Sequence, residues 1–148
     1  MVQTINPEIS RTAFTGRAFY VFTEASGYDY AIKHSEGRQN GNARIVFMPV
    51  SEFQQRPDDY RALIGAGFQP DDILACIYQF CPHAPFGEDT EKFERKGVGA
   101  KVLHQIIHDS MAHAKAVFVN PLLPKMKSLI EKHGFAPLIP TPHYYNLL

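Results

Sequence analysis

Apolar and polar positions in the first third of the chain follow the spacing of β-strands with one solvated face. Aromatic and β-branched residues are frequent there, as in strands generally. Two places carry turn residues, Ser26-Gly27 and the region of Asn40-Gly41. The pattern predicts an antiparallel meander with turns at these two places. The strands expected are residues 18–24, 28–34 and 43–50.

A helix and a buried strand are expected next. Pro57 suits a first helical position, and the two acidic residues that follow it suit the positive end of the helix dipole. We expect this helix to reach Ile64 and to stop at Gly65 or Gly67. Residues 73–80 are almost entirely apolar, which fits a buried strand or a buried helix. Their short length and their Ile, Tyr and Phe content favour the strand.

The second half of the chain has helical periodicity. Apolar residues recur every three to four positions from Gly97 onward, a short apolar strand occupies 116–119, and a second amphipathic helix covers 124–133. Three prolines in the tail predict that any strand there is irregular or at an edge. The order strand, helix, strand, helix indicates a crossover on a mixed sheet. We therefore expect an α+β (mixed α/β) fold with a central mixed sheet.

The composition indicates a single domain, and the charged residues are distributed unevenly along the chain. The 148 residues are 45% apolar and 20% charged, which is typical of a single globular domain over residues 1–148. Fifteen basic and fifteen acidic residues leave no formal net charge, which argues against a nucleic-acid-binding protein. Residues 1–90 nevertheless have four more acidic than basic residues, and residues 91–148 have four more basic than acidic ones.

The sequence also indicates a compartment. No apolar run approaches the roughly 18 residues that cross a bilayer, and the first residues lack the basic and apolar regions of a secretory signal. Cys76 and Cys81 do not have the spacing of a CxxC motif. We expect a cytoplasmic protein that does not associate with membranes.

Residues 81–96 are predicted to form a polar loop. The segment with the clearest chemical signal joins this loop to the helix that starts near Gly97. Backbone N–H groups at the start of a helix attract anions, and glycines let phosphate oxygens approach the backbone. A Gly-x-Gly turn is also compatible with a purely structural strand-to-helix turn. The phosphate-binding residues expected in the first case are Arg95, Lys96, Gly97, Val98, Gly99 and Ala100.

The order of motifs in this half resembles the acetyl-CoA-binding half of the GNAT superfamily of N-acetyltransferases. Gly97-Val98-Gly99 is similar to the core of that family's signature at the start of its central helix. Asn120 matches the end of the following strand, and Gly134-Phe135 matches the exit of the last helix. The resemblance covers residues 93–138, about 45 of the 148 residues.

The resemblance implies a fold, a cosubstrate and a reaction. Acetyl-CoA would lie between two parallel strands that splay apart, with its pyrophosphate on residues 95–100 and its pantetheine near Phe80 and Asn120. The amine of a small molecule, peptide or protein would attack the thioester directly. The resemblance does not decide whether the protein is a homodimer, and it implies no metal.

Candidate catalytic groups come from the chain itself. The tyrosine that often serves as general acid in this family is Ile130 here. The candidates for the acid or base are His83, Tyr78 and Tyr144. The alternative is a binding or interaction protein that retains the fold, with or without CoA binding, but has lost the chemistry. Acylation of an aminoacyl-RNA is a third interpretation.

Overall fold

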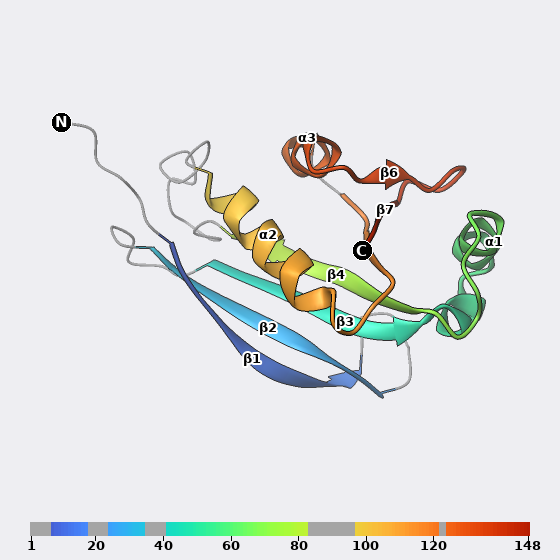
Figure 1. The fold of residues 1–148 in the computed structure, drawn as a ribbon, viewed down its shortest axis with the longest axis horizontal. Coiled ribbons are helices and arrows are strands. Elements are labelled where there is room, and N and C mark those ends of the chain that lie inside the picture. Colours follow the sequence, from blue (N-terminus) through green and yellow to red (C-terminus); the bar gives the residue numbers. More distant parts are fainter. Residues whose placement is uncertain (1–6, 18–23, 35–40, 83–96, 122–123) are drawn as a thin grey trace.

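The computed structural model has an α+β fold, as the sequence predicts: one seven-stranded, mostly antiparallel sheet with helices packed against it (Figure 1). The strand order is β1-β2-β3-β4-β5-β7-β6. The described part of the chain contains three α-helices and one 3-10 helix. The structure describes residues 7–17, 24–34, 41–82, 97–121 and 124–148.

The first four strands form an antiparallel meander, which confirms the expected topology. Each strand is hydrogen-bonded to the next one in the sequence, so successive side chains alternate between the two faces of the sheet. The four strands are β1 (Pro7–Arg17), β2 (Glu24–His34), β3 (Gly41–Pro49) and β4 (Ile73–Cys81).

One sequence-based detail of the meander is wrong, one falls outside the described residues, and one strand was not expected. The first strand is β1, over residues 7–17, whereas the strand expected at 18–24 lies almost wholly outside the described residues. Ser26 and Gly27 lie within β2 and make no turn. A Cβ atom at Gly27 would lie 2.0 Å from the backbone oxygen of Ile45, so this glycine permits a close approach of two strands.

A short helical region covers one face of the sheet. The 3-10 helix η1 (Val50–Gln55) and helix α1 (Pro57–Gly65) connect β3 to β4, and Pro57 and the acidic first turn stand where the sequence places them. α1 lies at the end of the sheet where β3 ends and β4 begins (Figure 1). Its buried residues join a cluster that contains Phe53, Leu74 and Phe118.

The other face is covered by the crossover between the two parallel strands. Strand β4 leads through helix α2 (Val98–Ser110) to β5 (Ala116–Val119), and β4 and β5 pair in parallel. This arrangement confirms the strand at 73–80 and the helix from Gly97. The buried side of α2 packs in a second cluster with Tyr30, Ile45 and Ile77.

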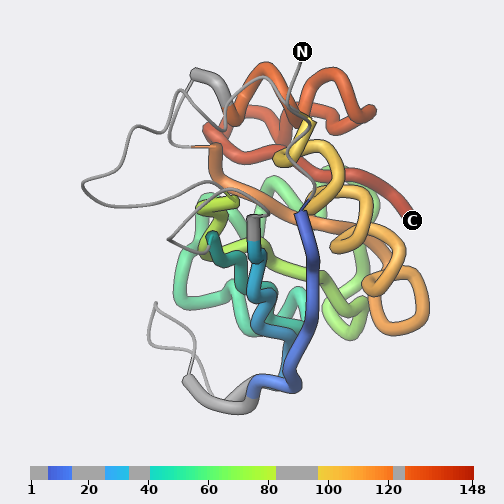
Figure 2. The backbone as a smooth tube through the Cα atoms, turned by 90° about the vertical axis from the view of Figure 1, so that its left-hand side faces the viewer, coloured from blue at the N-terminus to red at the C-terminus, as the bar shows by residue number. Residues whose placement is uncertain are grey.

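The C-terminal segment completes the sheet at the edge opposite β1, as the blue and red parts of the tube show (Figure 2). Helix α3 (Pro124–Lys132) is followed by β6 (Ala136–Pro137), a two-residue edge strand that contains a proline. Strand β7 (Tyr144–Leu147) is central, since it begins after the last proline and pairs with both β5 and β6.

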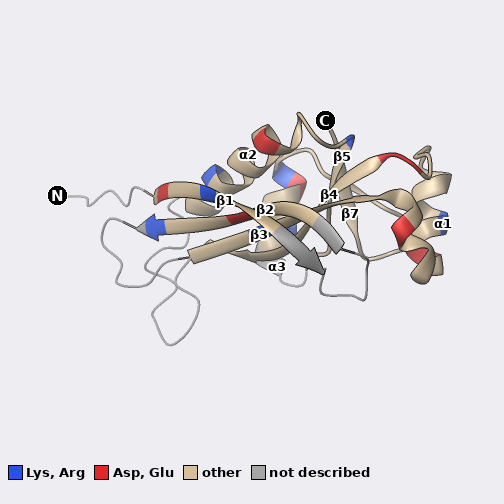
Figure 3. Cartoon of the chain, turned by 90° about the horizontal axis from the view of Figure 1, so that it is seen from below, with Lys and Arg blue, Asp and Glu red and all other residues tan. Residues whose placement is uncertain are grey.

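The acidic and basic parts of the sequence are not separate surfaces. Both signs of charge occur on β1, β2, α1 and α2 (Figure 3). Ion pairs also cross the boundary at residue 90: Arg11 contacts Asp109 at 2.8 Å, and Lys115 contacts Asp72 at 3.1 Å. Of the helices that the structure describes, none is long and apolar enough to cross a membrane.

Candidate functional site

The pairing of the two parallel strands stops at one end of the sheet. Their last pair is Ile77 with Val119, where β5 ends, while β4 continues to Cys81. At the same point two β4 residues, Tyr78 and Gln79, stand opposite the single β3 residue Arg44, which is a β-bulge. Bulges re-aim side chains and are frequent next to active sites. The end of the parallel pairing and the bulge together mark this end of the sheet as a candidate site.

Helix α2 begins at Gly97, which adopts φ +78° as its N-terminal cap. A Cβ atom added at Gly97 would meet no described atom within 4 Å. Gly99 is different, because a Cβ atom on it would lie 3.2 Å from the Leu129 side chain of α3. Among the described residues, Gly97 therefore leaves room at the helix start, and Gly99 lets α2 and α3 pack closely.

The structure positions some of the predicted residues and leaves others outside the described ranges. Val98 is buried, and Ala100 is half-buried in the first turn of α2. Phe80 is half-buried and packs against the core on the face of α2. Asn120 directly follows β5 and is half-buried. The predicted residues outside the described ranges are His83, Arg95 and Lys96.

The two candidate tyrosines lie on opposite faces of the sheet. Tyr144 packs on the face of α2 and α3, and its hydroxyl donates to Glu131 of α3 at 3.0 Å. Tyr78 packs against the cluster under η1 and α1. It also lies beside Arg44, whose guanidinium carbon is 6.0 Å from the centre of the tyrosine ring. The structure therefore does not bring these two hydroxyls together.

A buried charged cluster lies on the same face as Tyr78. His143 is 3% exposed, and its ring stacks on Phe118 of β5 with centres 4.9 Å apart. Its Nδ1 is 3.6 Å from Oδ1 of Asp59, which is itself 5% exposed. The other oxygen of Asp59 forms an ion pair with Nε of Arg56 at 3.0 Å. Arg56, Asp59 and His143 thus form a row from the start of α1 to the start of β7.

Neither ring nitrogen of His143 has a hydrogen-bond partner among the described residues. The 3.6 Å contact with Asp59 is longer than a hydrogen bond. A buried polar atom without a partner costs stability and is uncommon in folded proteins, so it usually has a functional or solvent-related explanation. Burial lowers the pKa of the His143 imidazole, and the Asp59 carboxylate opposes this effect.

His143 lies beside a groove of about 520 Å³. The groove lies beyond the last β5–β7 pair, Val119 with Tyr144, so Asn120 and His143 meet it at the open end of β5. Hydrogen bonds fix the segment that forms its rim, because the N–H of Leu138 donates to the carbonyl of His143 at 2.8 Å. The groove is lined by Arg56, Pro57, Asp58, Asp59, Asn120, Pro140, Thr141, Pro142 and His143.

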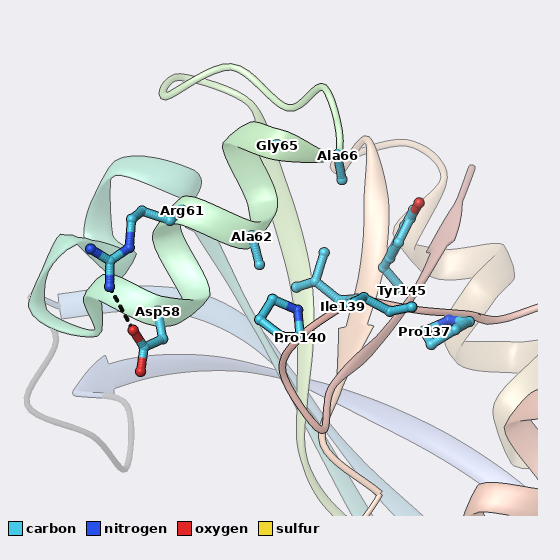
Figure 4. Close-up of a pocket in the computed structure, with 10 residues that line it drawn as sticks. Asp58, Arg61, Ala62, Gly65, Ala66, Pro137, Ile139, Pro140 and Tyr145 are labelled. Carbon is cyan, nitrogen blue, oxygen red and sulfur yellow. Dashed lines mark hydrogen bonds and ion pairs between the residues drawn. The ribbon is translucent and has the colours of Figure 1, made fainter.

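A second hollow of about 440 Å³ adjoins this groove and shares Asp58 and Pro140 with it. It lies between α1 and the segment before β7, with Ala62 of α1 opposite Pro140 and Ile139 (Figure 4). The ion pair of Asp58 with Arg61 lies at its outer end (Figure 4). Ile139 is 76% exposed, so this second hollow has an apolar, solvent-facing wall.

The sequence alone did not reveal the His143 cluster. From the sequence, Asp59 is interpreted as a helix-start residue, and His143 is not considered. The only available signal was a histidine directly before the final aromatic strand. No group of three or more His, Cys, Asp or Glu side chains in the described residues is arranged to hold a metal ion.

Comparison with protein-family models gives no match, and comparison with curated proteins gives none either.

Proposed function

We propose that the protein is an acetyl-CoA-dependent N-acetyltransferase of the GNAT type. The observation that carries the proposal is the end of the pairing between β4 and β5 at Ile77 and Val119, beyond which β4 continues to Cys81. The resemblance of residues 93–138 to the GNAT superfamily implies an opening between two parallel strands. Under that resemblance the two strands would be the segments 73–80 and 116–119.

The start of α2 suits the diphosphate of CoA. A Cβ atom on its cap, Gly97, would have no described atom within 4 Å, and the first N–H groups of the helix lie next to this residue. The helix dipole and unpaired N–H groups there favour an anion. Lys101 is exposed in the first turn and adds positive charge. The pantetheine arm would then run along β4 beside Gln79 and Phe80 toward Asn120.

In this arrangement the acyl carbonyl lies near the bulge at Tyr78 and Gln79. A backbone N–H in an irregular part of a strand is available to polarise a carbonyl, as oxyanion holes do. The amine of a small molecule, peptide or protein would approach from the face of η1 and α1, where Tyr78 and the groove lie.

Charge reversal at the start of α2 tests the cosubstrate. We expect wild-type protein to bind acetyl-CoA in isothermal titration calorimetry. The Lys101→Glu variant should bind about threefold to thirtyfold more weakly at low salt, since each charge near a helix terminus contributes about 0.3–1 kcal/mol and the reversal counts twice. Lys127→Glu, on the exposed side of α3, is the matched control and should bind like wild type. Absence of acetyl-CoA binding to the wild-type protein at millimolar concentration would refute the proposal.

An inactive GNAT-type protein that retains CoA is the second candidate. The position of the usual general acid is Ile130, which is fully buried in the core, so its role is packing. This candidate predicts CoA binding without release of free thiol in the presence of any amine. A thiol-release assay with amines separates the two candidates.

A further inference from the structure

We propose that the imidazole of His143 is the proton acceptor of the transfer reaction and that the groove beside it receives the acceptor amine. This inference rests on the proposed acetyltransfer function. It replaces none of the residues proposed to hold CoA at the start of α2, because α2 packs on the other face of the sheet from His143. It assigns a role to a buried cluster that core packing does not explain.

The row of three side chains gives His143 a defined orientation. Asp59 is held by Arg56 through one oxygen and points its other oxygen toward Nδ1 of His143. A carboxylate next to Nδ1 favours the tautomer with a proton on that atom, which leaves the lone pair on Nε2. A carboxylate in this position also stabilises the imidazolium that forms when Nε2 accepts a proton. Asp59 is thus a positioning residue.

His143 and its groove lie near the point where the pairing between β4 and β5 ends. His143 stacks on Phe118, and Cys76 pairs with Phe118 in the parallel ladder two residues before Tyr78. His143 and Tyr78 therefore share a face, on either side of the end of β5. Both ring nitrogens lie below the surface. A water must therefore move in from the groove to carry the proton to Nε2. Asn120 and Thr141 line the groove and supply polar groups for that water.

The charges around His143 are few and paired. The ionisable groups that face it or its groove are Arg56, Asp58 and Asp59, all from α1 or the residue before it; β5 contributes Phe118 and Asn120, which are neutral. Burial lowers the pKa of His143 and Asp59 opposes that shift. The imidazole is therefore neutral at pH 7 and able to accept a proton.

The chemical step balances without any further reactant. An ammonium R–NH3⁺ in the groove transfers one proton through the water to Nε2 of His143. The freed nitrogen lone pair attacks the thioester carbon, a C–N bond forms, and the C–S bond breaks. The thiolate leaves with its electron pair and takes the second proton that the attacking nitrogen must lose, which gives the neutral amide and the free thiol. The imidazolium of His143 later releases its proton to solvent.

Nuclear magnetic resonance of histidine-labelled protein tests the tautomer without an acceptor. Long-range proton–nitrogen correlations at pH 7.5 should show His143 with a proton on Nδ1 and none on Nε2. The signal is assigned by its disappearance in the His143→Gln variant. A proton on Nε2 at this pH would overturn the proposal, since no lone pair would then face the groove.

Kinetics test the role itself, with spermidine, ethanolamine and triglycine as probe amines and thiol release as the signal. His143→Gln should lower kcat/KM by about 10²–10⁴-fold and leave the affinity for acetyl-CoA unchanged. His108→Gln, an exposed histidine on α2, is the matched control and should behave like wild type. Asp59→Asn should move the acidic limb of the pH–rate profile to lower pH, because His143 loses the carboxylate that raises its pKa.

Each failure has a separate meaning. Loss of acetyl-CoA binding by the wild-type protein refutes the proposed function as a whole. Normal binding with unchanged kcat/KM in His143→Gln refutes only the role of His143. Normal binding with no transfer to any probe amine refutes it too, since a proton acceptor without transfer has no role. An Asp59→Asn variant that loses stability without a shifted pH profile shows a purely structural role for Asp59.

Discussion

Replacing Asp109 with alanine is expected to destabilise the fold strongly, because this buried carboxylate connects three elements. Asp109 is 6% exposed near the end of α2. One oxygen accepts the hydroxyl of Tyr30 at 2.8 Å, and the other accepts Gln105 at 3.1 Å and Arg11 at 2.8 Å. Tyr30 is 1% exposed, and burial raises the pKa of its phenol above the usual range, so it donates as the neutral group.

The magnitude follows from which partners are buried. The Tyr30 hydroxyl would lose its acceptor inside the core, at a cost of about 1–3 kcal/mol. The hydrogen bond from half-buried Gln105 adds about 1 kcal/mol. Arg11 contributes little, about 0–1 kcal/mol, because half of its side chain is in solvent. We expect a total near 3 kcal/mol, and a melting temperature lowered by about 6–12 °C for a domain of this size.

Urea unfolding followed by circular dichroism measures this loss. Asp58→Ala is the control, since that carboxylate is 87% exposed and also forms an ion pair with an arginine; its effect should stay within about 0.5 kcal/mol. Tyr30→Phe together with Asp109→Ala should cost less than the two single changes added, because both partners are then removed. An Asp109→Ala loss below about 1 kcal/mol would show that the network adds nothing to the core packing and would refute the reasoning.

Two further predictions concern β2 and the acid stability of the fold. Gly27→Ala should cost about 3 kcal/mol or more, because its Cβ would lie 2.0 Å from a backbone oxygen of Ile45; Gly65→Ala, with nothing within 4 Å, should be neutral or slightly stabilising in the same thermal unfolding assay. Burial lowers the pKa of His143, so the unfolded chain binds a proton at this residue more readily than the folded chain does. The folded state therefore keeps its full stability above pH of about 6.5 and loses stability as the pH falls below that value. His143→Gln should therefore show a shallower loss of stability on acidification from about pH 6.5 to 5, and an unchanged slope would contradict the buried, neutral imidazole.

Local sequence signals were sufficient for most of the fold. The proline and acidic residues that begin α1, the helical periodicity after Gly97 and the apolar run of β4 each depend on neighbours within a few positions, and each prediction is confirmed. The first strand was missed because Pro7–Arg17 contains few apolar residues. Its residues are largely exposed, and its pairing with β2 gives it a place in the sheet.

The candidate site depends on contacts between distant residues, which local patterns do not encode. Gly27 resembles a turn residue until Ile45 is known to lie across from it. Asp59 and His143 are 84 residues apart, and only the folding of η1 and α1 onto the face of β5 brings them together. The catalytic candidate Tyr144 directly follows His143 in the sequence, but alternation along the strand places its side chain on the opposite face of the sheet from His143.

The position of β7 affects how the chain is made. Synthesis delivers β5 well before β7, yet β7 lies between β5 and β6 in the finished sheet. Until Tyr144–Leu147 emerge from the ribosome, the fully buried strand Ala116–Val119 has an open edge that can pair with another chain. A nascent or truncated chain that ends before residue 144 is therefore prone to aggregation, and the last few residues protect the centre of the molecule.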